Sequence, residues 1–142
     1  MPSPLTTFRT CNPAELGQPL GSYAQVLEVP AGAGLIFLSG QTPMRADGSI
    51  PTDFDEQAEL VWHRIQVALA AVGLECRHIC RVVTYLLDSA DASRHARVRA
   101  RYLGDARPAS TGVVVRQLFN PAYRLEVEVT AARPPASGAA GG

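Results

Sequence analysis

Residues 53–88, "DFDEQAELVWHRIQVALAAVGLECRHICRVVTYLLD", decide the fold, because a helical pattern is followed directly by a strand pattern. Apolar residues recur there at three- and four-residue steps, which predicts one apolar helical stripe: Phe54, Ala58, Val61, Ile65, Ala68 and Val72. Asp53 and Glu56 resemble a capping box, and Gly73 stands where helices commonly end. Residues 78–88 are rich in strand formers on both faces. A helix that packs on a buried strand is therefore predicted, with Trp62 as a packing residue.

Toward the N-terminus, residues 22–41, "SYAQVLEVPAGAGLIFLSGQ", predict two strands around a turn. The strands are expected at 26–29 and 35–38, and "PAGAG" supplies the proline and glycines of a reversal. Gly40 ends the second strand, where a glycine marks a bulge or a close approach of the backbone. We therefore expect a hairpin that finishes at Gly40.

Toward the C-terminus, residues 89–104 predict a second helix, with Ser89 as its cap and Gly104 as its stop. Arg94, Arg97 and Arg101 share one face of that helix, which is typical of a solvated face, and Arg99 points elsewhere. Residues 109–118 and 123–132 predict two further strands. The order β-β-α-β-α-β-β is typical of an α+β domain with two helices on one face of a mixed sheet.

The last predicted strand alternates in polarity. Tyr123, Leu125, Val127 and Val129 face one way, toward the helices, while Glu126 and Glu128 face the other. The opposite face of the sheet is too apolar for water, and Val82, Leu86 and Val114 are its candidate residues. An uncovered apolar face normally marks an interface, so we expect an oligomer with Glu126 and Glu128 near a subunit boundary.

The bulk composition limits the classes of partner. The 142 residues fit a single domain, placed at 1–132, and "RPPASGAAGG" at 133–142 predicts a disordered tail. Thirteen basic and thirteen acidic residues cancel, which argues against nucleic acid or an anionic membrane as partner. No apolar run is long enough to span a bilayer, and the first residues lack the pattern of a secretory signal. A cytoplasmic protein is expected.

The three cysteines do not predict a disulfide framework or a metal site. Their number is odd, and no signal sequence is expected. "CRHIC" at 76–80 places His78 between Cys76 and Cys80, but no second pair of ligands exists at zinc-site spacing. A polar turn followed by a buried cysteine is the preferred interpretation, and no metal or cofactor is expected.

Five segments together resemble the Rid family (RidA/YjgF), over about residues 18–132. They are "GSYAQ", "LIFLSGQTP", "DGSIPTDFDEQAE" with "ALAAVGLECRHICRVVTYLLD", "RPASTGVVVRQL" and "LEVEVTA", in the family's order and spacing. The resemblance implies a chorismate-mutase-like fold and a homotrimer with a barrel-like core of sheets and a cleft at each subunit boundary. It also implies hydrolysis of reactive enamines or imines to ketones and ammonia, without cofactor or metal.

The resemblance also assigns the site residues. Tyr23 matches the family's cleft tyrosine, Ser39 and Gly40 match its Ser-Gly, and Glu126 matches the glutamate that positions water. The family's carboxylate-binding arginine corresponds to Ser110, followed by Thr111 and Gly112. The family's helical asparagine corresponds to Arg99.

The presence of Ser110 in place of the family's arginine decides the expected substrate specificity. A serine hydroxyl cannot replace the planar fork of donors with which arginine binds a carboxylate. Arg99 and Arg107 are the candidates to compensate, whereas Arg116 lies too far along the strand. We predict a deaminase that differs in specificity from enzymes of the 2-aminoacrylate type, with Glu126 and Tyr23 as catalytic residues. The alternative is a non-catalytic trimer that binds a small metabolite or acts like a chaperone.

Overall fold

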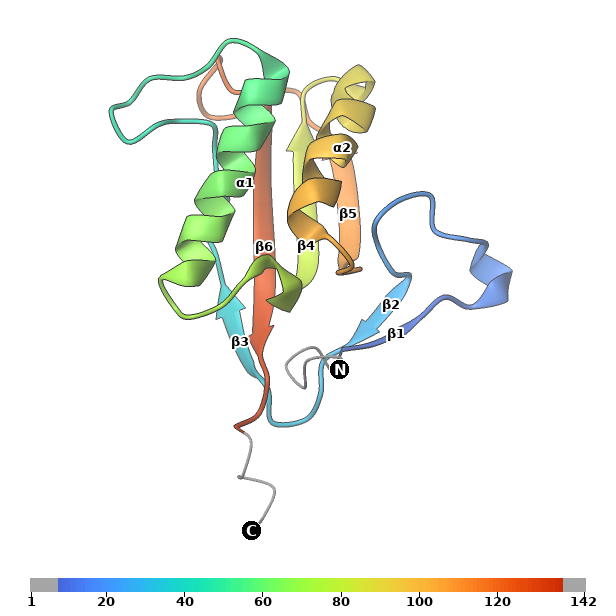
Figure 1. Ribbon diagram of the computed structural model, residues 1–142. Coiled ribbons are helices and arrows are strands. Elements are labelled where there is room, and N and C mark those ends of the chain that lie inside the picture. Colours follow the sequence, from blue (N-terminus) through green and yellow to red (C-terminus); the bar gives the residue numbers. More distant parts are fainter. Residues whose placement is uncertain (1–7, 137–142) are drawn as a thin grey trace.

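A computed structural model of the chain describes residues 8–136, and the fold is that of an α+β domain (Figure 1). Its elements in chain order are β1 (Arg9–Cys11), η1 (Ala14–Leu16), β2 (Val26–Glu28), β3 (Gly34–Phe37), α1 (Phe54–Ala70), η2 (Cys76–His78), β4 (Ile79–Leu86), η3 (Ser89–Asp91), α2 (Ala92–Leu103), β5 (Ala109–Val114) and β6 (Leu125–Arg133). The predicted order of strands and helices is confirmed, with the short strand β1 added in front.

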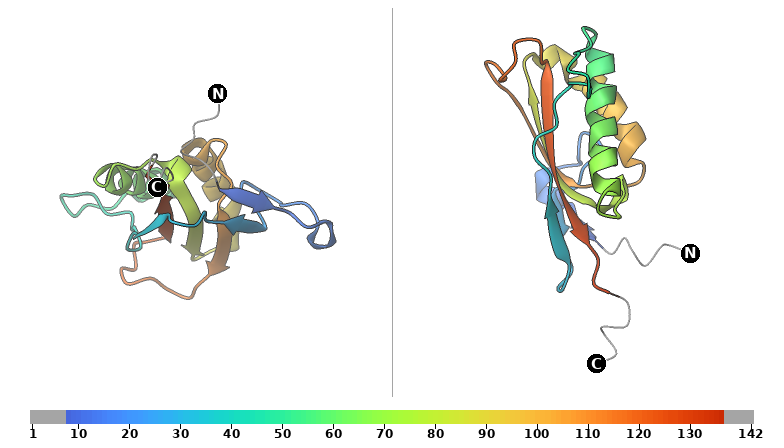
Figure 2. Two further views of the ribbon diagram at one scale, coloured as in Figure 1. Left: turned by 90° about the horizontal axis from the view of Figure 1, so that it is seen from below. Right: turned by 90° about the vertical axis from the view of Figure 1, so that its left-hand side faces the viewer.

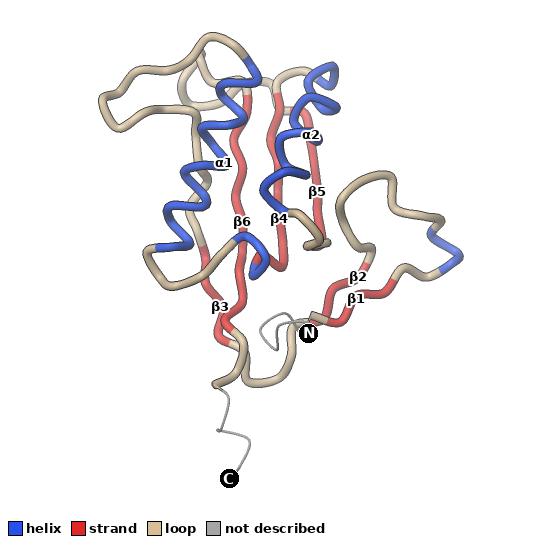
Figure 3. Tube along the Cα trace, viewed as in Figure 1, coloured by secondary structure: helices blue, strands red, loops and turns tan. Residues whose placement is uncertain are grey.

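A four-stranded mixed sheet forms the body of the molecule, in the order β3-β6-β4-β5. Only β4 and β5 run parallel, because α2 carries the chain between them. Both helices lie on one face of this sheet, and no helix of the described residues lies on the other (Figure 2). The chain trace shows β1 and β2 as a separate ribbon beside the lower end of β5 (Figure 3).

The core lies between the sheet and the helices. The predicted stripe of α1 is buried there at Phe54, Ala58, Val61 and Ile65, and β6 contributes Leu125, Val127 and Val129. The last residue of the predicted stripe, Val72, lies beyond the end of α1 and is exposed, so the prediction is wrong there. Trp62 is fully buried, as predicted, and its indole Nε1 donates to His95 Nε2 at 3.0 Å. The alternation of β6 is therefore confirmed, and it places Glu126 and Glu128 on the face without helices.

The predicted hairpin at 22–41 is wrong. β2 pairs with β1, and β3 pairs with β6, where Phe37 lies opposite Thr130. "PAGAG" does reverse the chain, but the two strands separate after it. β3 instead pairs along its whole length with the C-terminal end of β6, from Thr130 to Arg133.

The residues predicted for the uncovered face are also wrong. Val82 and Leu86 belong to the core beneath the helices, and Val114, opposite Leu86, lies on the same face of the sheet although it is exposed. Side chains alternate along a strand, so a shift by one residue exchanges the faces, and β4 is apolar on both. The face without helices instead carries exposed Leu35 (52%) and Phe37 (74%) of β3.

The helix ends differ in detail from the prediction. Asp53 caps α1, and its carboxylate accepts the Glu56 N–H at 3.0 Å. Asp88 caps η3, the turn ahead of α2, and accepts the Ala90 N–H at 2.8 Å, while Asp91 stands at the N-cap of α2, so the prediction of Ser89 is wrong. Aspartate offers a charged acceptor to the first turn, which favours it over the hydroxyl beside it.

The basic face of α2 is less solvated than predicted. Arg94 contacts the carboxylates of Asp53, Asp55 and Asp91 and thereby ties α2 to the start of α1. Arg101 pairs with Glu59 of α1. Of the predicted trio only Arg97 is exposed without an ion pair among residues 8–136.

The cysteine segment and the termini complete the fold. His78 Nδ1 accepts the Glu75 N–H at 2.9 Å, and Cys76 and Cys80 are buried, which confirms the predicted turn. β6 continues to Arg133, and residues 137–142 of the predicted tail lie outside the described residues. Across 8–136, no helix is long and apolar enough to cross a bilayer. The cytoplasmic location stays a prediction.

Candidate active site

Glu126 lies against Gly40 on the face of the sheet without helices. Phe37 lies opposite Thr130, and Gln41 lies opposite Val127. Between these two pairs the chain at Ser39–Gly40 has one residue more than β6. This extra residue makes a bulge, as the glycine predicted. A Cβ built on Gly40 would lie 3.0 Å from the Glu126 carboxyl carbon, so only glycine allows the close approach.

A cavity of about 370 Å³ opens beside this contact. It is lined by Gly40, Tyr85, Val115, Gln117, Leu118, Phe119, Glu126 and Glu128. Tyr85 lies opposite Glu126 in the β4–β6 register, and its hydroxyl donates to Glu128 Oε1 at 2.6 Å. One carboxylate is thus held by tyrosine, while the other forms no ion pair with any residue of 8–136.

The environment keeps Glu126 protonated to a higher pH than an ordinary glutamate. Partial burial raises the pKa of its carboxyl, and the charge of neighbouring Glu128 raises the pKa further. A pairing with Arg124 or Arg116 would have opposed this. Arg124 instead contacts Asp91 at 3.0 Å. A carboxylate with this environment can accept a proton from a bound water.

A second group of predicted residues lies on the helix side of the sheet. Arg99 of α2 points toward the loop before β2, where a Cβ on Gly21 would lie 3.4 Å from Arg99 Nη2. Burial lowers the pKa of Arg99, and the negative form of nearby Tyr23 would raise it. The Arg99 Nε is buried and makes no hydrogen bond within the described residues. Arg99 therefore departs from the exposed face of its helix, as predicted.

Tyr23 and Ser110 are brought toward each other by the backbone. The Tyr23 hydroxyl accepts the Leu20 N–H at 3.1 Å, and the Ala24 N–H donates to Pro108 O at 3.2 Å. This bond fixes the tyrosine segment at the start of β5, two residues before Ser110. Tyr23 and Ser110 are both half-buried.

The strand register separates the residues predicted on β5. Ser110 lies opposite Val82 and Gly112 opposite Thr84, so both share the face that the helices cover. Thr111 lies opposite Val83, on the other face, and is exposed. A Cβ on Gly112 would meet no heavy atom within 4 Å, so its glycine leaves open space at this edge.

The two groups of predicted residues do not meet within one chain. Glu126 lies opposite Tyr85, and Ser110 lies opposite Val82, three residues earlier on β4, which is about 10 Å along the strand. Ser110 and Glu126 also face opposite sides of the sheet. One chain thus holds one half of the predicted site on each face.

Arg107, the other arginine expected to compensate for Ser110, lies away from Glu126. It lines a separate cavity with Phe8 and Leu103. No group of three or more His, Cys, Asp or Glu side chains in the described part of the chain is placed to hold a metal ion.

The sequence did not predict Tyr85 and Phe119 as residues that line the Glu126 cavity. The opposition of Tyr85 and Glu126 across two strands had no local signal.

Comparison with known proteins identifies relatives of the chain. Residues 14–133 match the family model described as Endoribonuclease L-PSP. The protein DfrA of Myxococcus xanthus is 37% identical over 101 residues, which cover 70% of this chain and 76% of that protein. A protein described as putative reactive intermediate deaminase TdcF, of Escherichia coli, is 26% identical over 118 residues, with 80% and 88% covered.

Solved structures share the fold. The Rid-family protein YyfB of Yersinia pestis superimposes with a TM-score of 0.78 at 23% identity, over 87% of this chain and 97% of that one. The structure of Escherichia coli TdcF with bound serine gives a TM-score of 0.66 at 28% identity, with 81% and 91% covered.

Proposed function

The chain belongs to the Rid (YjgF) family, and on this premise we propose that it hydrolyses a reactive imine or enamine to a carbonyl compound and ammonia. The description of TdcF as a reactive intermediate deaminase supports this class of reaction. The observation that carries the proposal is Glu126, which is half-buried against Gly40 and has no ion pair among residues 8–136.

The reaction needs one base and one route for protons. Water adds to the carbon of the protonated imine while Glu126 accepts a proton from that water, which gives a carbinolamine. The same carboxylic acid then returns the proton to the nitrogen. As the C–N bond breaks and ammonia leaves, the Glu126 carboxylate takes the proton of the hydroxyl group, the carbonyl forms, and ammonia carries that proton away as ammonium. The raised pKa of Glu126 suits a group that both accepts and returns a proton.

We propose that two chains complete each site, in a homotrimer. Exposed Leu35 and Phe37 on the face without helices support an interface there. The neighbouring chain would bring its Tyr23 and Arg99 toward Glu126. Tyr23 would donate a hydrogen bond to the substrate, and the Arg99 Nε that lacks an acceptor in the described chain would bind a polar substrate group.

The substrate is proposed to lack the carboxylate of a small 2-imino acid, or to be bulkier than one. Ser110 offers a hydroxyl in place of the family's arginine fork, and Gly112 on the same face leaves open space, while the Thr111 hydroxyl lies on the other face of the sheet. A ribonuclease activity is less compatible with the cavity, because Glu126 and Glu128 line it and the net charge of the chain is zero.

Imine hydrolysis measured directly tests the proposal. Imines would be generated in place by amino acid or amine oxidases with catalase, and their loss followed with and without the protein. We expect acceleration for imines without a carboxylate, and a fall of about 10²–10⁴-fold in Glu126→Gln. Glu56→Gln, on the exposed first turn of α1, is the matched control.

A third variant tests the specificity. Ser110→Arg should raise the rate on small 2-imino acids, because it restores the fork of donors. Wild-type protein that accelerates no imine would favour the alternative, a trimer that binds a metabolite without catalysis. The single observation on that side is Ser110 itself, which removes the family's substrate anchor.

A further inference from the structure

A second cavity lies apart from Glu126, between the β1–β2 ribbon and the connection from α2 to β5. Its volume is about 510 Å³, within the range of about 300–1,000 Å³ for small-molecule pockets. It is lined by Phe8, Thr10, Leu27, Arg77, Leu103, Asp105, Ala106 and Arg107. It shares no lining residue with the Glu126 cavity.

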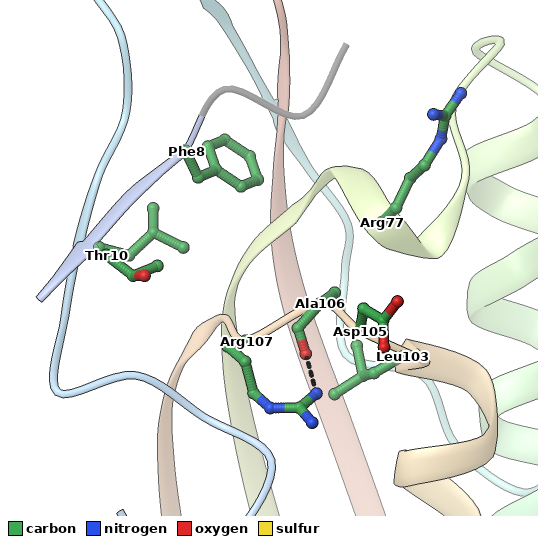
Figure 4. A pocket seen from close by; sticks show the side chains of 8 residues that line it. Phe8, Thr10, Arg77, Leu103, Asp105, Ala106 and Arg107 are labelled. Carbon is green, nitrogen blue, oxygen red and sulfur yellow. Dashed lines mark hydrogen bonds between the residues drawn. The ribbon is translucent and has the colours of Figure 1, made fainter. Parts of the chain in front are cut away.

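One part of this lining is apolar. Figure 4 shows the Phe8 ring and Thr10 on one side and Leu103 with Ala106 on the other. Leu27 of β2 completes the apolar part, and Leu103 is 3% exposed at the end of α2. An apolar group of moderate size would be removed from water between Phe8 and Leu103.

The other part of the lining carries charges of both signs. The Arg107 side chain is held by the backbone just before it, because its Nη1 donates to the carbonyl oxygens of Gly104 and Ala106, each at 2.8 Å. This fixes the guanidinium, and its remaining donors have no acceptor within residues 8–136. Asp105 forms no ion pair or side-chain hydrogen bond in that part of the chain either.

The second arginine of the lining is already neutralised. Arg77 Nη2 contacts Glu75 Oε2 at 2.8 Å, and its side chain points away from Phe8 (Figure 4). The charges that the cavity offers to a ligand are therefore one fixed guanidinium and one carboxylate, beside an apolar wall.

We propose that this cavity binds a free α-amino acid with an apolar side chain. Arg107 binds its carboxylate, Asp105 binds its ammonium group, and the side chain lies between Phe8 and Leu103. A simple carboxylate would leave Asp105 unpaired beside a negative ligand, and a simple amine would leave Arg107 unpaired. A zwitterion pairs with both charges at once. This inference does not depend on the proposed hydrolysis of imines.

Titration calorimetry with the intact protein tests the site, with L-leucine and L-phenylalanine as probes. We expect 3-phenylpropionate, which lacks the ammonium, and 2-phenylethylamine, which lacks the carboxylate, to bind at least about tenfold more weakly, since each loses one charge-assisted contact. Equal binding of 3-phenylpropionate would refute the role of Asp105.

Variants locate the binding. Asp105→Asn and Arg107→Gln should each weaken L-phenylalanine about tenfold or more, whereas Arg97→Gln, exposed on α2, should not. Asp105 makes no side-chain contact that the fold needs, so Asp105→Asn remains informative if Arg107→Gln unfolds. No binding of either amino acid at millimolar concentration, or undiminished binding by Asp105→Asn, would overturn the proposal.

Discussion

Gly40→Ala separates the geometry of the active site from the stability of the fold. The added Cβ would overlap Glu126 Oε2 and would lie 3.0 Å from the Glu126 carboxyl carbon and 3.2 Å from its Cγ. Ordinary carbon contacts are about 3.5–4.0 Å, so the carboxyl carbon must retreat by about 0.5–1 Å. A catalytic group displaced by 1 Å can cost about 10²-fold in rate. We therefore expect kcat/KM for imine hydrolysis to fall by about two orders of magnitude.

The stability should change little in the same variant. Gly40 does not have a positive φ, so its backbone accepts alanine, which restricts the unfolded chain and stabilises by about 0.4–1 kcal/mol. Moving the half-buried Glu126 side chain off its rotamer costs about 0.5–1.5 kcal/mol, so the two effects nearly cancel.

Urea unfolding beside the kinetics would measure both effects. Gly34→Ala on β3, where the nearest atom to an added Cβ is 4.0 Å away, is the matched control. Full activity in Gly40→Ala would refute the reasoning, because the position of the Glu126 carboxylate would then not matter.

Three further predictions follow from charge and exposure. Glu128→Gln removes the charge that helps to raise the pKa of Glu126, so the acid limb of the pH profile of kcat/KM should move to lower pH. If the limb does not move, Glu126 is not the titrating base. Burial lowers the pKa of His95 to about 3, so the unfolding free energy should fall by roughly 1.4 kcal/mol per pH unit as pH drops from about 6.5 toward 3. His95→Gln should flatten this dependence in urea unfolding at pH 7 and 4.5. Phe37→Asp should dissociate the proposed trimer in sedimentation and abolish activity, and a fully active monomer would contradict the shared site.

Local patterns were enough to predict the elements of this fold. The period of the apolar residues gave α1, and the alternation from Tyr123 to Val129 placed Glu126 on the correct face of β6. Both patterns reflect a single boundary between core and surrounding water. Where a segment lies along this boundary over its whole length, its sequence predicts both its secondary structure and its buried face.

Long-range pairing could not be predicted in the same way. Phe37 lies opposite Thr130, far along the chain, and no local signal favours that partner over the strand on the other side of "PAGAG". β4 is apolar on both faces, so its pattern did not show whether Val82 or Val83 faces the helices. The role of Tyr85 depends on both the pairing and the face, and it was missed for that reason.

Ser110 and Glu126 lie on opposite faces of the sheet, and this separation affects how the substrate specificity of the predicted site can change. Glu126 is fixed by the bulge at Gly40 and by its neighbours on β4 and β6, none of which Ser110 contacts through the strand register. Ser110 lies about 10 Å along the strand direction from the level of Glu126 and on the other face of the sheet. We therefore expect a change at residue 110 to alter which substrate groups bind while the placement of the Glu126 carboxylate is unchanged. With the proposed roles of these residues, Ser110 in place of the family's arginine is compatible with activation of water by Glu126.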